Sequence, residues 1–276
     1  MEKGIFTFIG NATFLIRYGN VTILTDPNFL HRGEYAYLGH GLTSKRLHAP
    51  ASTVDQLPRL DAVVLSHLHG DHWDRRAQAG LDHALPVITT EHAAKKLRRR
   101  GFEKAAGLAI WESRTVTADG DWVRVTAVPG RHGPSWATTA RILPPVMGSI
   151  LEFGSGTEPP KLCVYVSGDT LAVEDLAEIP RRYPRIHSGV FHLGGTRLPF
   201  GDKIPWGLTV TMDGIEGVKA VNLISPDYAI PVHFDDYGVF ASPLSAFLDE
   251  MEQQGMSERI IHVPRGQSVE LPPPPR

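Results

Sequence analysis

A dense group of metal-binding residue types occupies one short segment of the chain. We call this group the His/Asp motif, and it consists of His67, His69, Asp71 and His72. Imidazole and carboxylate groups suit Zn²⁺ and related divalent ions without any thiolate, so the motif predicts a metal site. The alternatives are a His-rich surface loop and a structural zinc site. Structural zinc sites are closed and usually rich in cysteine, whereas this chain has one cysteine, Cys163, expected to be a small buried hydrophobe.

The segment before the motif suggests how its side chains converge. Residues 61–66 form a continuous apolar run, which is typical of a strand covered on both faces. His67 and His69 alternate at the end of this strand, so they should point to the same side. Gly70 then permits a bend in the chain, after which Asp71 and His72 can also face the metal site. We therefore expect two metal-facing pairs of side chains.

Three further polar residues follow apolar strands elsewhere in the chain: His132, Asp169 and His233. Sites on layered α/β folds gather where strands end. Taken alone, each histidine could equally be structural, and Asp169 could cap a turn. Together with the His/Asp motif, the three residues would supply enough ligands for two metal ions.

The elements that must position these residues alternate between strands and helices. Gly-Asn turn signals separate three strand-like runs near the N-terminus, and Asp119-Gly120 marks a hairpin. Residues 27–60 are rich in glycine and proline, and we expect a long irregular stretch there, of the kind that is often functional. Strands are expected over residues 5–9, 13–17, 21–25, 149–153, 161–167 and 228–232, a hairpin over 115–128, and helices over 90–100, 172–182, 213–223 and 243–254.

Two polar features of the expected helices have structural interpretations. The basic end of helix 90–100 should be a solvated face that complements the helix dipole. A nucleic-acid patch there would need aromatic partners that are absent nearby in the sequence. Asp213 begins a helical pattern, so an N-cap role is favoured over a catalytic one.

Length and composition favour one soluble domain. The chain has 276 residues, of which 42% are hydrophobic and 21% charged, and its formal charge of −2 gives no general attraction to nucleic acid or membranes. No apolar run approaches the length of a membrane span and no signal peptide is recognised, so we expect a cytoplasmic protein. We expect a single domain over residues 1–271 and a Pro-rich tail over 272–276. The order of elements suggests two sheets packed face to face with helices outside.

The His/Asp motif, His132, Asp169 and His233 resemble, in order, the metal motifs of the metallo-β-lactamase superfamily. The resemblance spans residues 5–240. Segments 10–16 and 23–27 are similar to the branch that holds ascorbate-6-phosphate lactonase-like proteins and phospholipase-D-type hydrolases of N-acylphosphatidylethanolamine. The resemblance implies an α/β fold, a four-layer αββα sandwich of two mixed sheets. It also implies two divalent metal ions per chain, with Zn²⁺ favoured over Mn²⁺ and Fe²⁺.

The resemblance also implies a role for each ligand. In this assignment the first metal is held by His67, His69 and His132, the second by Asp71, His72 and His233, and Asp169 bridges the two. Asp26 would support the ligands from behind. The expected catalytic residues are Asp71 and His233, and Asp71 could orient a metal-activated hydroxide or take its proton. Asn11 stands where many relatives have histidine, so it is expected to be a turn or supporting residue with no inherited role.

Substrate contacts are expected from loops near the ligands. The candidates are Asn28, His31, Arg131, Trp136, His192, Arg197 and Tyr237. A cationic residue among them could hold a phosphate or carboxylate. For most of them a plain surface role is the alternative, and His192 could instead be a core histidine.

The leading hypothesis is a metal-dependent hydrolase that cleaves a small ester, lactone or phosphodiester. A nuclease or other phosphodiesterase of the same fold is the alternative, but a nuclease would need a basic groove or an added domain. A di-iron redox protein would need a fused redox module, and a non-catalytic metal-binding protein would be expected to lack ligands. The expected partner is a small-molecule substrate and not nucleic acid. A homo-oligomer is plausible, although no interface can be named.

Overall fold

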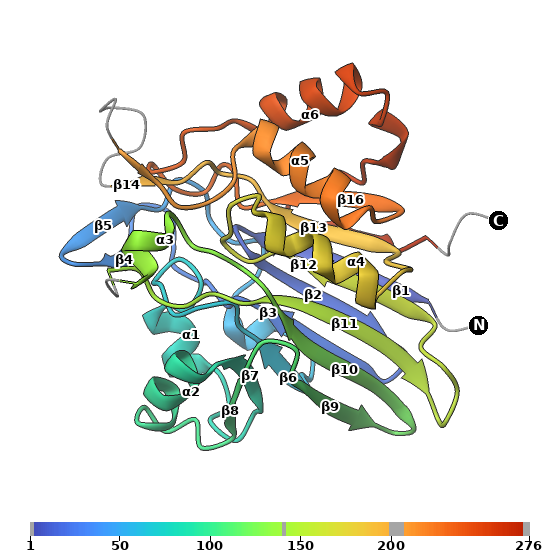
Figure 1. The fold of residues 1–276 in the computed structure, drawn as a ribbon. Coiled ribbons are helices and arrows are strands. Elements are labelled where there is room, and N and C mark those ends of the chain that lie inside the picture. The colour runs from blue at the N-terminus through green and yellow to red at the C-terminus, as the bar shows by residue number, and fades with distance from the viewer. Residues whose placement is uncertain (1–2, 140–141, 199–206, 273–276) are drawn as a thin grey trace.

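Two β-sheets pack face to face at the centre of the molecule (Figure 1). The computed structural model describes residues 3–139, 142–198 and 207–272. The first sheet has the strand order β17-β1-β2-β3-β6-β7-β8 and the second β16-β13-β12-β11-β10-β9. The first consists of β1 (Gly4–Gly10), β2 (Thr13–Tyr18), β3 (Val21–Thr25), β6 (Ala62–Val64), β7 (Val87–Thr90), β8 (Ala105–Leu108) and β17 (Ser268–Glu270). The second consists of β9 (Ser113–Ala118), β10 (Asp121–Val128), β11 (Gly148–Ser155), β12 (Leu162–Val166), β13 (Ser188–His192) and β16 (Tyr228–Val232).

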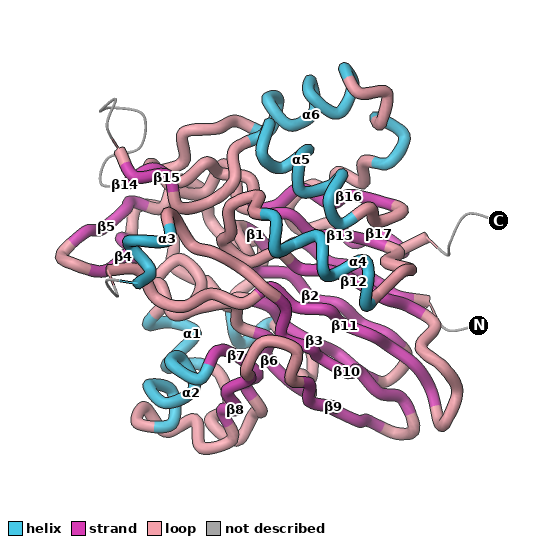
Figure 2. Tube along the Cα trace, in the orientation of Figure 1, coloured by secondary structure: helices cyan, strands magenta, loops and turns pink. Residues whose placement is uncertain are grey.

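Helices cover the outer face of each sheet (Figure 2). Helices α1 (Arg75–Gly80) and α2 (Glu91–Arg98) lie outside the first sheet, and α4 (Glu178–Arg182), α5 (Gly214–Ile224) and α6 (Leu244–Gln253) lie outside the second. Apolar side chains fill the space between the sheets and the space under each helical layer. The predicted four-layer αββα sandwich with two mixed sheets is therefore confirmed.

The expected strands and most expected helices are present. The expected hairpin over residues 115–128 is formed by β9 and β10. Asp213 caps α5, since its side chain accepts a hydrogen bond from the backbone N–H of Glu216 at 2.8 Å. The helix expected over residues 172–182 is shorter, because a 3₁₀ turn, η2 (Glu174–Ala177), precedes α4.

The prediction of an irregular stretch over residues 27–60 is wrong in part. Strands β4 (Tyr35–Gly39) and β5 (Leu42–Lys45) form a hairpin, and a 3₁₀ turn, η1 (Val54–Gln56), follows. Ala36 and Leu38 of β4 are buried while Tyr35 and Tyr37, which alternate with them, are exposed, and this is the pattern of a half-buried strand. Two strands this short, separated by a Gly-rich turn, give too weak a periodic signal to be recognised in sequence.

The remaining small elements lie beside this hairpin or near the C-terminus. They are α3 (Ser135–Thr139), β14 (Arg197–Leu198), β15 (Leu208–Thr209) and the 3₁₀ turn η4 (Ser257–Arg259). Strand β17 pairs with β1, so the end of the described chain joins the first sheet. No helix in residues 3–139, 142–198 or 207–272 is both long and apolar enough to cross a membrane. The single domain over 1–271 stays a prediction, and the predicted tail lies, from residue 273 on, outside the described residues.

Strand direction explains why polar residues gather at one edge of the sandwich. In the first sheet, β3 and β6 are parallel neighbours. In the second, β12, β13 and β16 are parallel, and β10 runs the same way because β11 is antiparallel to both β10 and β12. The loops that follow these strands carry Asp26, the His/Asp motif, His132, Asp169 and His233. The carboxyl ends of the two sheets therefore deliver these residues to a common place.

Gly70 has a different function from the expected one. A Cβ atom at this position would lie 2.6 Å from the backbone nitrogen of Tyr37 and 2.7 Å from its carbonyl oxygen. The N–H of Gly70 donates to that carbonyl at 2.9 Å. Glycine is thus needed because the β4 backbone packs directly on the motif, and not because the chain bends there through a left-handed conformation.

Replacing Gly70 by alanine should destabilise the protein by about 1–3 kcal/mol, because the new methyl group would push β4 away from the motif. The matched control is Gly238→Ala, since a Cβ at Gly238 meets nothing within 4 Å. Chemical denaturation of the metal-free proteins measures both changes. Equal stability of the two variants would contradict the packing argument.

Candidate metal centre

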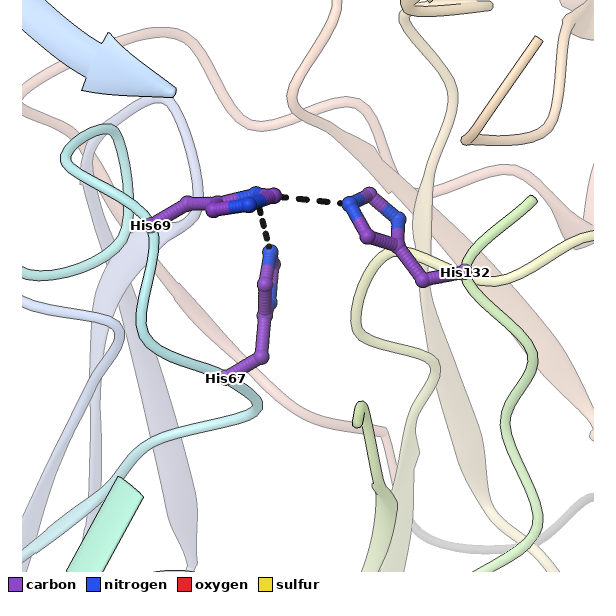
Figure 3. A group of neighbouring side chains, drawn as sticks. All are labelled: His67, His69 and His132. Carbon is purple, nitrogen blue, oxygen red and sulfur yellow. Dashed lines mark hydrogen bonds between the residues drawn. The ribbon is translucent and has the colours of Figure 1, made fainter. Parts of the chain in front are cut away.

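Three histidines form the first half of the site, and their rings converge on one point (Figure 3). The Nδ1 atom of His69 lies 3.1 Å from Nε2 of His67 and 3.3 Å from Nε2 of His132. Two nitrogens bound tetrahedrally to one Zn²⁺ at about 2.0–2.1 Å would lie about 3.3–3.4 Å apart. The observed spacing is therefore close to the spacing that a shared ion requires.

Contacts behind the rings select the nitrogens that face this point. The Nδ1 atom of His132 lies 2.8 Å from the carbonyl oxygen of Val210, to which only an N–H can donate. This leaves the lone pair on Nε2. The Nδ1 atom of His67 lies 3.0 Å from the hydroxyl of Ser66, so its Nε2 also faces the cluster. The ring orientations fit a metal-binding group.

Two carboxylates and two histidines form the second half of the site: Asp71, His72, Asp169 and His233. Oδ2 of Asp71 lies 3.4 Å from Nε2 of His233, and Oδ1 of Asp169 lies 3.4 Å from Nε2 of His72. All four residues are at most 3% exposed. Several of their polar atoms are buried without a hydrogen-bond partner: Oδ1 of Asp71, Nε2 of His72, Oδ1 of Asp169 and Nδ1 of His233. A divalent cation would satisfy such atoms, so the donor set fits a metal.

Asp26 and His192 lie behind the second group. Oδ1 of Asp26 is 3.5 Å from Nδ1 of His72 and accepts hydrogen bonds from the backbone and hydroxyl of Ser66. Oδ2 of Asp26 is 3.7 Å from Nε2 of His192, whose Nδ1 contacts Ser167. This is the position from which a carboxylate orients a ligand histidine. Asp26, His72 and His192 also form a third group with metal-binding geometry.

Burial keeps the three histidines of the first group uncharged. Burial, and then the charge of His132, lower the pKa of His69 to about 3. Burial also lowers the pKa values of His67 and His132 below the ordinary histidine value. These imidazoles therefore keep their lone pairs at neutral pH and well below it, and metal ligation requires those lone pairs.

The second group concentrates negative charge around His72. Burial opposes its protonation, but Asp169, Asp71 and Asp26 outweigh burial and raise the pKa of His72 well above the ordinary value. For Asp71, burial raises the pKa, yet the charge of His72 and the contact with His233 bring it down to about 2. In the metal-free protein a proton on His72 partly balances the carboxylates, and a divalent cation would take over that function.

Asn11 connects the two sheets at the site. The side-chain amide of Asn11 donates to the backbone carbonyl of Asp71 at 2.7 Å, and the backbone carbonyl of Asn11 accepts a hydrogen bond from the backbone N–H of His233 at 3.1 Å. Its φ of 56° lies in the left-handed region, which asparagine tolerates better than most residues. Asn11 is thus both a turn residue and a support for two candidate ligands.

A buried ion pair beside Asn11 was not anticipated from the sequence. Arg46 is fully buried and lies 3.2 Å from Asp236, whose other oxygen accepts the backbone N–H of Asn11 at 2.6 Å. Arg265 also bonds to Asp236. Asp236 follows His233 closely, so the pair holds the loop that carries this histidine. An arginine in a segment predicted to be a loop is expected to be exposed, so nothing in the sequence indicated that Arg46 is buried.

A cavity of about 520 Å³ lies against His69. His69 is 9% exposed, more than any other member of the two groups. The cavity is lined by Tyr37, Gly39 and His40 of the β4–β5 hairpin, Leu68 and His69, His92 and Lys96 of α2, and residues 142–145. A second, smaller cavity of about 330 Å³ also touches His69, but it is lined on its other sides by residues such as Trp73 and Asp74.

None of the seven residues predicted to contact substrate lines this cavity. Asn28 and Tyr237 are buried, and the tyrosine hydroxyl donates to the Asn28 side chain at 2.9 Å. His31 lines a separate hollow beside α1, and Trp136 on α3 is 59% exposed.

The other three candidates are buried to different extents. His192 is fully buried beneath the ligands. Arg131 and Arg197 are half-buried, and each has a buried Nε atom without a partner. Arg131 directly precedes His132, and its backbone N–H donates to the hydroxyl of Thr170 at 2.8 Å. Arg131 therefore stays a candidate next to His132, and the role of Arg197 stays a prediction.

Acid should destabilise the metal-free protein through the first group. The folded-state pKa of His69 is about 3, so between about pH 6.5 and 3 the unfolded chain binds a proton that the folded chain does not. The free energy of unfolding should then fall with decreasing pH, by at most about 1.4 kcal/mol per pH unit for one histidine. His72 acts in the opposite sense, since its stabilisation is present at low pH and is lost as pH rises through its raised pKa.

Comparing the pH dependence of unfolding in the wild type and in His69→Gln isolates this contribution. The variant should show a smaller loss of stability between pH 6.5 and 4. Identical slopes for the two proteins would contradict a neutral buried His69.

Comparisons with known proteins find relatives that align along nearly the whole chain. A metal-dependent hydrolase from Deinococcus radiodurans is 28% identical over 263 residues, covering 95% of this chain and 97% of its own. One from Pelotomaculum thermopropionicum is 29% identical over 269 residues, covering 96% and 99%. The crystal structure of an isothiocyanate hydrolase from Delia radicum gut bacteria superposes with a TM-score of 0.78 at 20% identity, covering 96% of this chain and 98% of that one.

Residues 22–234 match the family described as the beta-lactamase superfamily domain. The matched region contains the His/Asp motif, His132, Asp169 and His233. The chain belongs to this superfamily.

Proposed function

We propose that this protein is a metal-dependent hydrolase that uses two divalent metal ions to cleave a small ester, lactone or phosphodiester. The observation that carries the proposal is the two buried donor groups, several of whose polar atoms have no hydrogen-bond partner. Relatives that align along their whole length are named metal-dependent hydrolases, which supports the same reaction class. The cavity of about 520 Å³ suits a small-molecule substrate.

Each donor group would hold one ion. In this assignment His67, His69 and His132 would hold the first ion, and Asp71, His72 and His233 would hold the second. Asp169 lies in the second group and would be the ligand shared with the first. When bound, two such ions lower the pKa of a shared water toward neutrality and supply a hydroxide nucleophile. The nitrogen and oxygen donors favour Zn²⁺, with Mn²⁺ or Fe²⁺ as alternatives.

The protein's own residues would orient the reacting groups. Oδ2 of Asp71 faces His233 and Oδ1 has no hydrogen-bond partner, so one oxygen would bind metal while the other accepts a proton or holds a water. Asp26 fixes the ring of His72 from behind. The burial of all these groups excludes bulk water, which strengthens their electrostatic effect on a substrate.

Metal binding can be measured directly on the purified, metal-stripped protein. About two equivalents of Zn²⁺ should bind and raise the melting temperature, because the ions bind the folded state alone. His69→Ala should lose at least one equivalent. His48→Ala is the control, since His48 is exposed and belongs to neither group. Unchanged metal content in His69→Ala would contradict the assignment.

Turnover should depend on the carboxylate of Asp71. A panel of 4-nitrophenyl esters, lactones, phosphodiesters and an isothiocyanate tests the reaction class. For a substrate that is cleaved, Asp71→Asn should lower kcat by about 10²–10⁴-fold, because the amide cannot accept the proton. Asp249→Asn, on the exposed face of α6, should leave kcat unchanged. Metal-loaded protein that cleaves no member of the panel would count against a hydrolase of this type.

A further inference from the structure

The cavity against His69 has one polar side, formed by α2. His92 and Lys96 are four residues apart on this helix, so they lie one turn apart on the same face. Both line the cavity. Thr90 caps the helix by accepting the backbone N–H of Ala93 at 3.2 Å, which fixes the start of α2 and therefore the direction of both side chains. Sequence alone favours a solvated helix face here, whereas the fold turns part of that face toward the metal cluster.

Neither polar side chain on this wall has its bonding satisfied by the protein. The Nδ1 atom of His92 is buried and has no hydrogen-bond partner. Lys96 forms no ion pair with any acidic side chain in the described part of the chain. Burial, followed by the charge of Lys96, lowers the pKa of His92, so its imidazole is neutral beside a cationic amine. One positive charge and one neutral hydrogen-bonding group therefore face the same space.

Much of the remaining lining of the cavity is apolar. This part of the lining, which we call the apolar wall, consists of Ile142, Leu143, Pro144 and Pro145, together with Leu68 and Tyr37. Nε2 of His40 lies 2.7 Å from the carbonyl oxygen of Ile142, which joins the wall to the β4–β5 hairpin. An elongated ligand could therefore place a charged end on α2 and an apolar body against this wall.

The cavity is also next to the metal cluster. Nδ1 of His69 faces the other two histidines of its group, whereas its Nε2 faces Gly39. A Cβ atom on Gly39 would lie 4.0 Å from this Nε2. A ligand in the cavity thus lies one imidazole ring away from the first donor group.

We infer that this cavity selects substrates that carry an oxyanion, a carboxylate or a phosphate, which binds to Lys96 and His92 while an apolar body packs against residues 142–145. The inference rests on the proposed function in one respect, because it takes the ligand to be the substrate of the metal cluster. The charge of Lys96 supplies attraction and His92 supplies a directed hydrogen bond. The apolar wall adds affinity without selecting for charge.

Binding is tested with a matched pair of ethers that cannot be hydrolysed, 4-(4-nitrophenoxy)butanoate and the neutral 4-(4-nitrophenoxy)butanamide. Calorimetry on the zinc-loaded protein should show tighter binding of the carboxylate. Lys96→Ala should remove about fivefold of that preference, as expected for a partly exposed charge pair. Lys96→Arg should retain it. Lys95→Ala is the matched control, since Lys95 is exposed on α2 and does not line the cavity.

The same experiment separates this pocket from direct ligation of the carboxylate by metal. If the carboxylate binds only the zinc ions, Lys96→Ala will leave its preference unchanged, and the inference is overturned. Equal affinity for the two ethers, or no binding of either, also overturns it. His92→Leu should weaken carboxylate binding while His92→Gln, which keeps a hydrogen-bond donor, should retain most of it.

Turnover separates failure of the pocket from failure of the proposed function. The anionic ester mono-4-nitrophenyl glutarate is compared with neutral 4-nitrophenyl butyrate. Lys96→Ala should raise KM for the anionic ester about fivefold with little change in kcat, and should leave the neutral ester unaffected. If neither ester is cleaved but Lys96→Ala still removes the binding preference, the inference about the cavity is supported and the proposed ester hydrolysis is contradicted. Equal effects on both esters would contradict selection by charge.

Discussion

Three carboxylates surround one imidazole in a place that water hardly reaches. Asp26, Asp71 and Asp169 approach His72, and none of the four residues is more than 3% exposed. Buried charges are costly unless they are paired or coordinate a metal. The three carboxylates raise the pKa of His72 above its ordinary value although burial opposes this, so the negative charge of the site favours a cation. The rest of the molecule has to hold these groups together against their mutual repulsion.

The fold achieves this through the direction of its strands and through unusual backbone conformations at their ends. Strands that run the same way in both sheets end at the site, so each ligand needs a short loop. Asn11, Asp26 and His233 all have positive φ angles, of 56°, 35° and 61°. Such conformations cost free energy in residues other than glycine and tend to cluster at functional sites. Here they turn the side chains sharply from the strand ends into the cluster, and the Arg46–Asp236 ion pair keeps the last of these loops in position.

Much of this site could be predicted because its signal is local. The His/Asp motif lies within one short segment, and His132, Asp169 and His233 each follow an apolar strand that the periodicity of the sequence reveals. The αββα layers follow from the same periodicity together with the family resemblance. The structure brings every predicted ligand into one of two adjoining groups with metal-binding geometry.

The residues around the cluster could not be predicted, because their placement depends on contacts between distant segments. In the sequence, Lys96 belongs to the basic end of a helix. Only the fold brings it to the same cavity as His69 and the β4–β5 hairpin. Arg46 reads as a loop residue, yet the fold buries it against Asp236. Asn28 and Tyr237 read as loop residues able to meet a substrate, but they bond to each other inside the protein. Side-chain placement of this kind follows from tertiary packing, which one sequence does not reveal.

The most direct test of the account is the position of metal ions in crystals of the zinc-loaded protein, located by anomalous diffraction at the zinc edge. The account predicts two peaks about 3.5–4 Å apart. One should lie among His67, His69 and His132 and the other among Asp71, His72, Asp169 and His233. A single ion held by Asp26, His72 and His192, or ions bound only outside these groups, would contradict it.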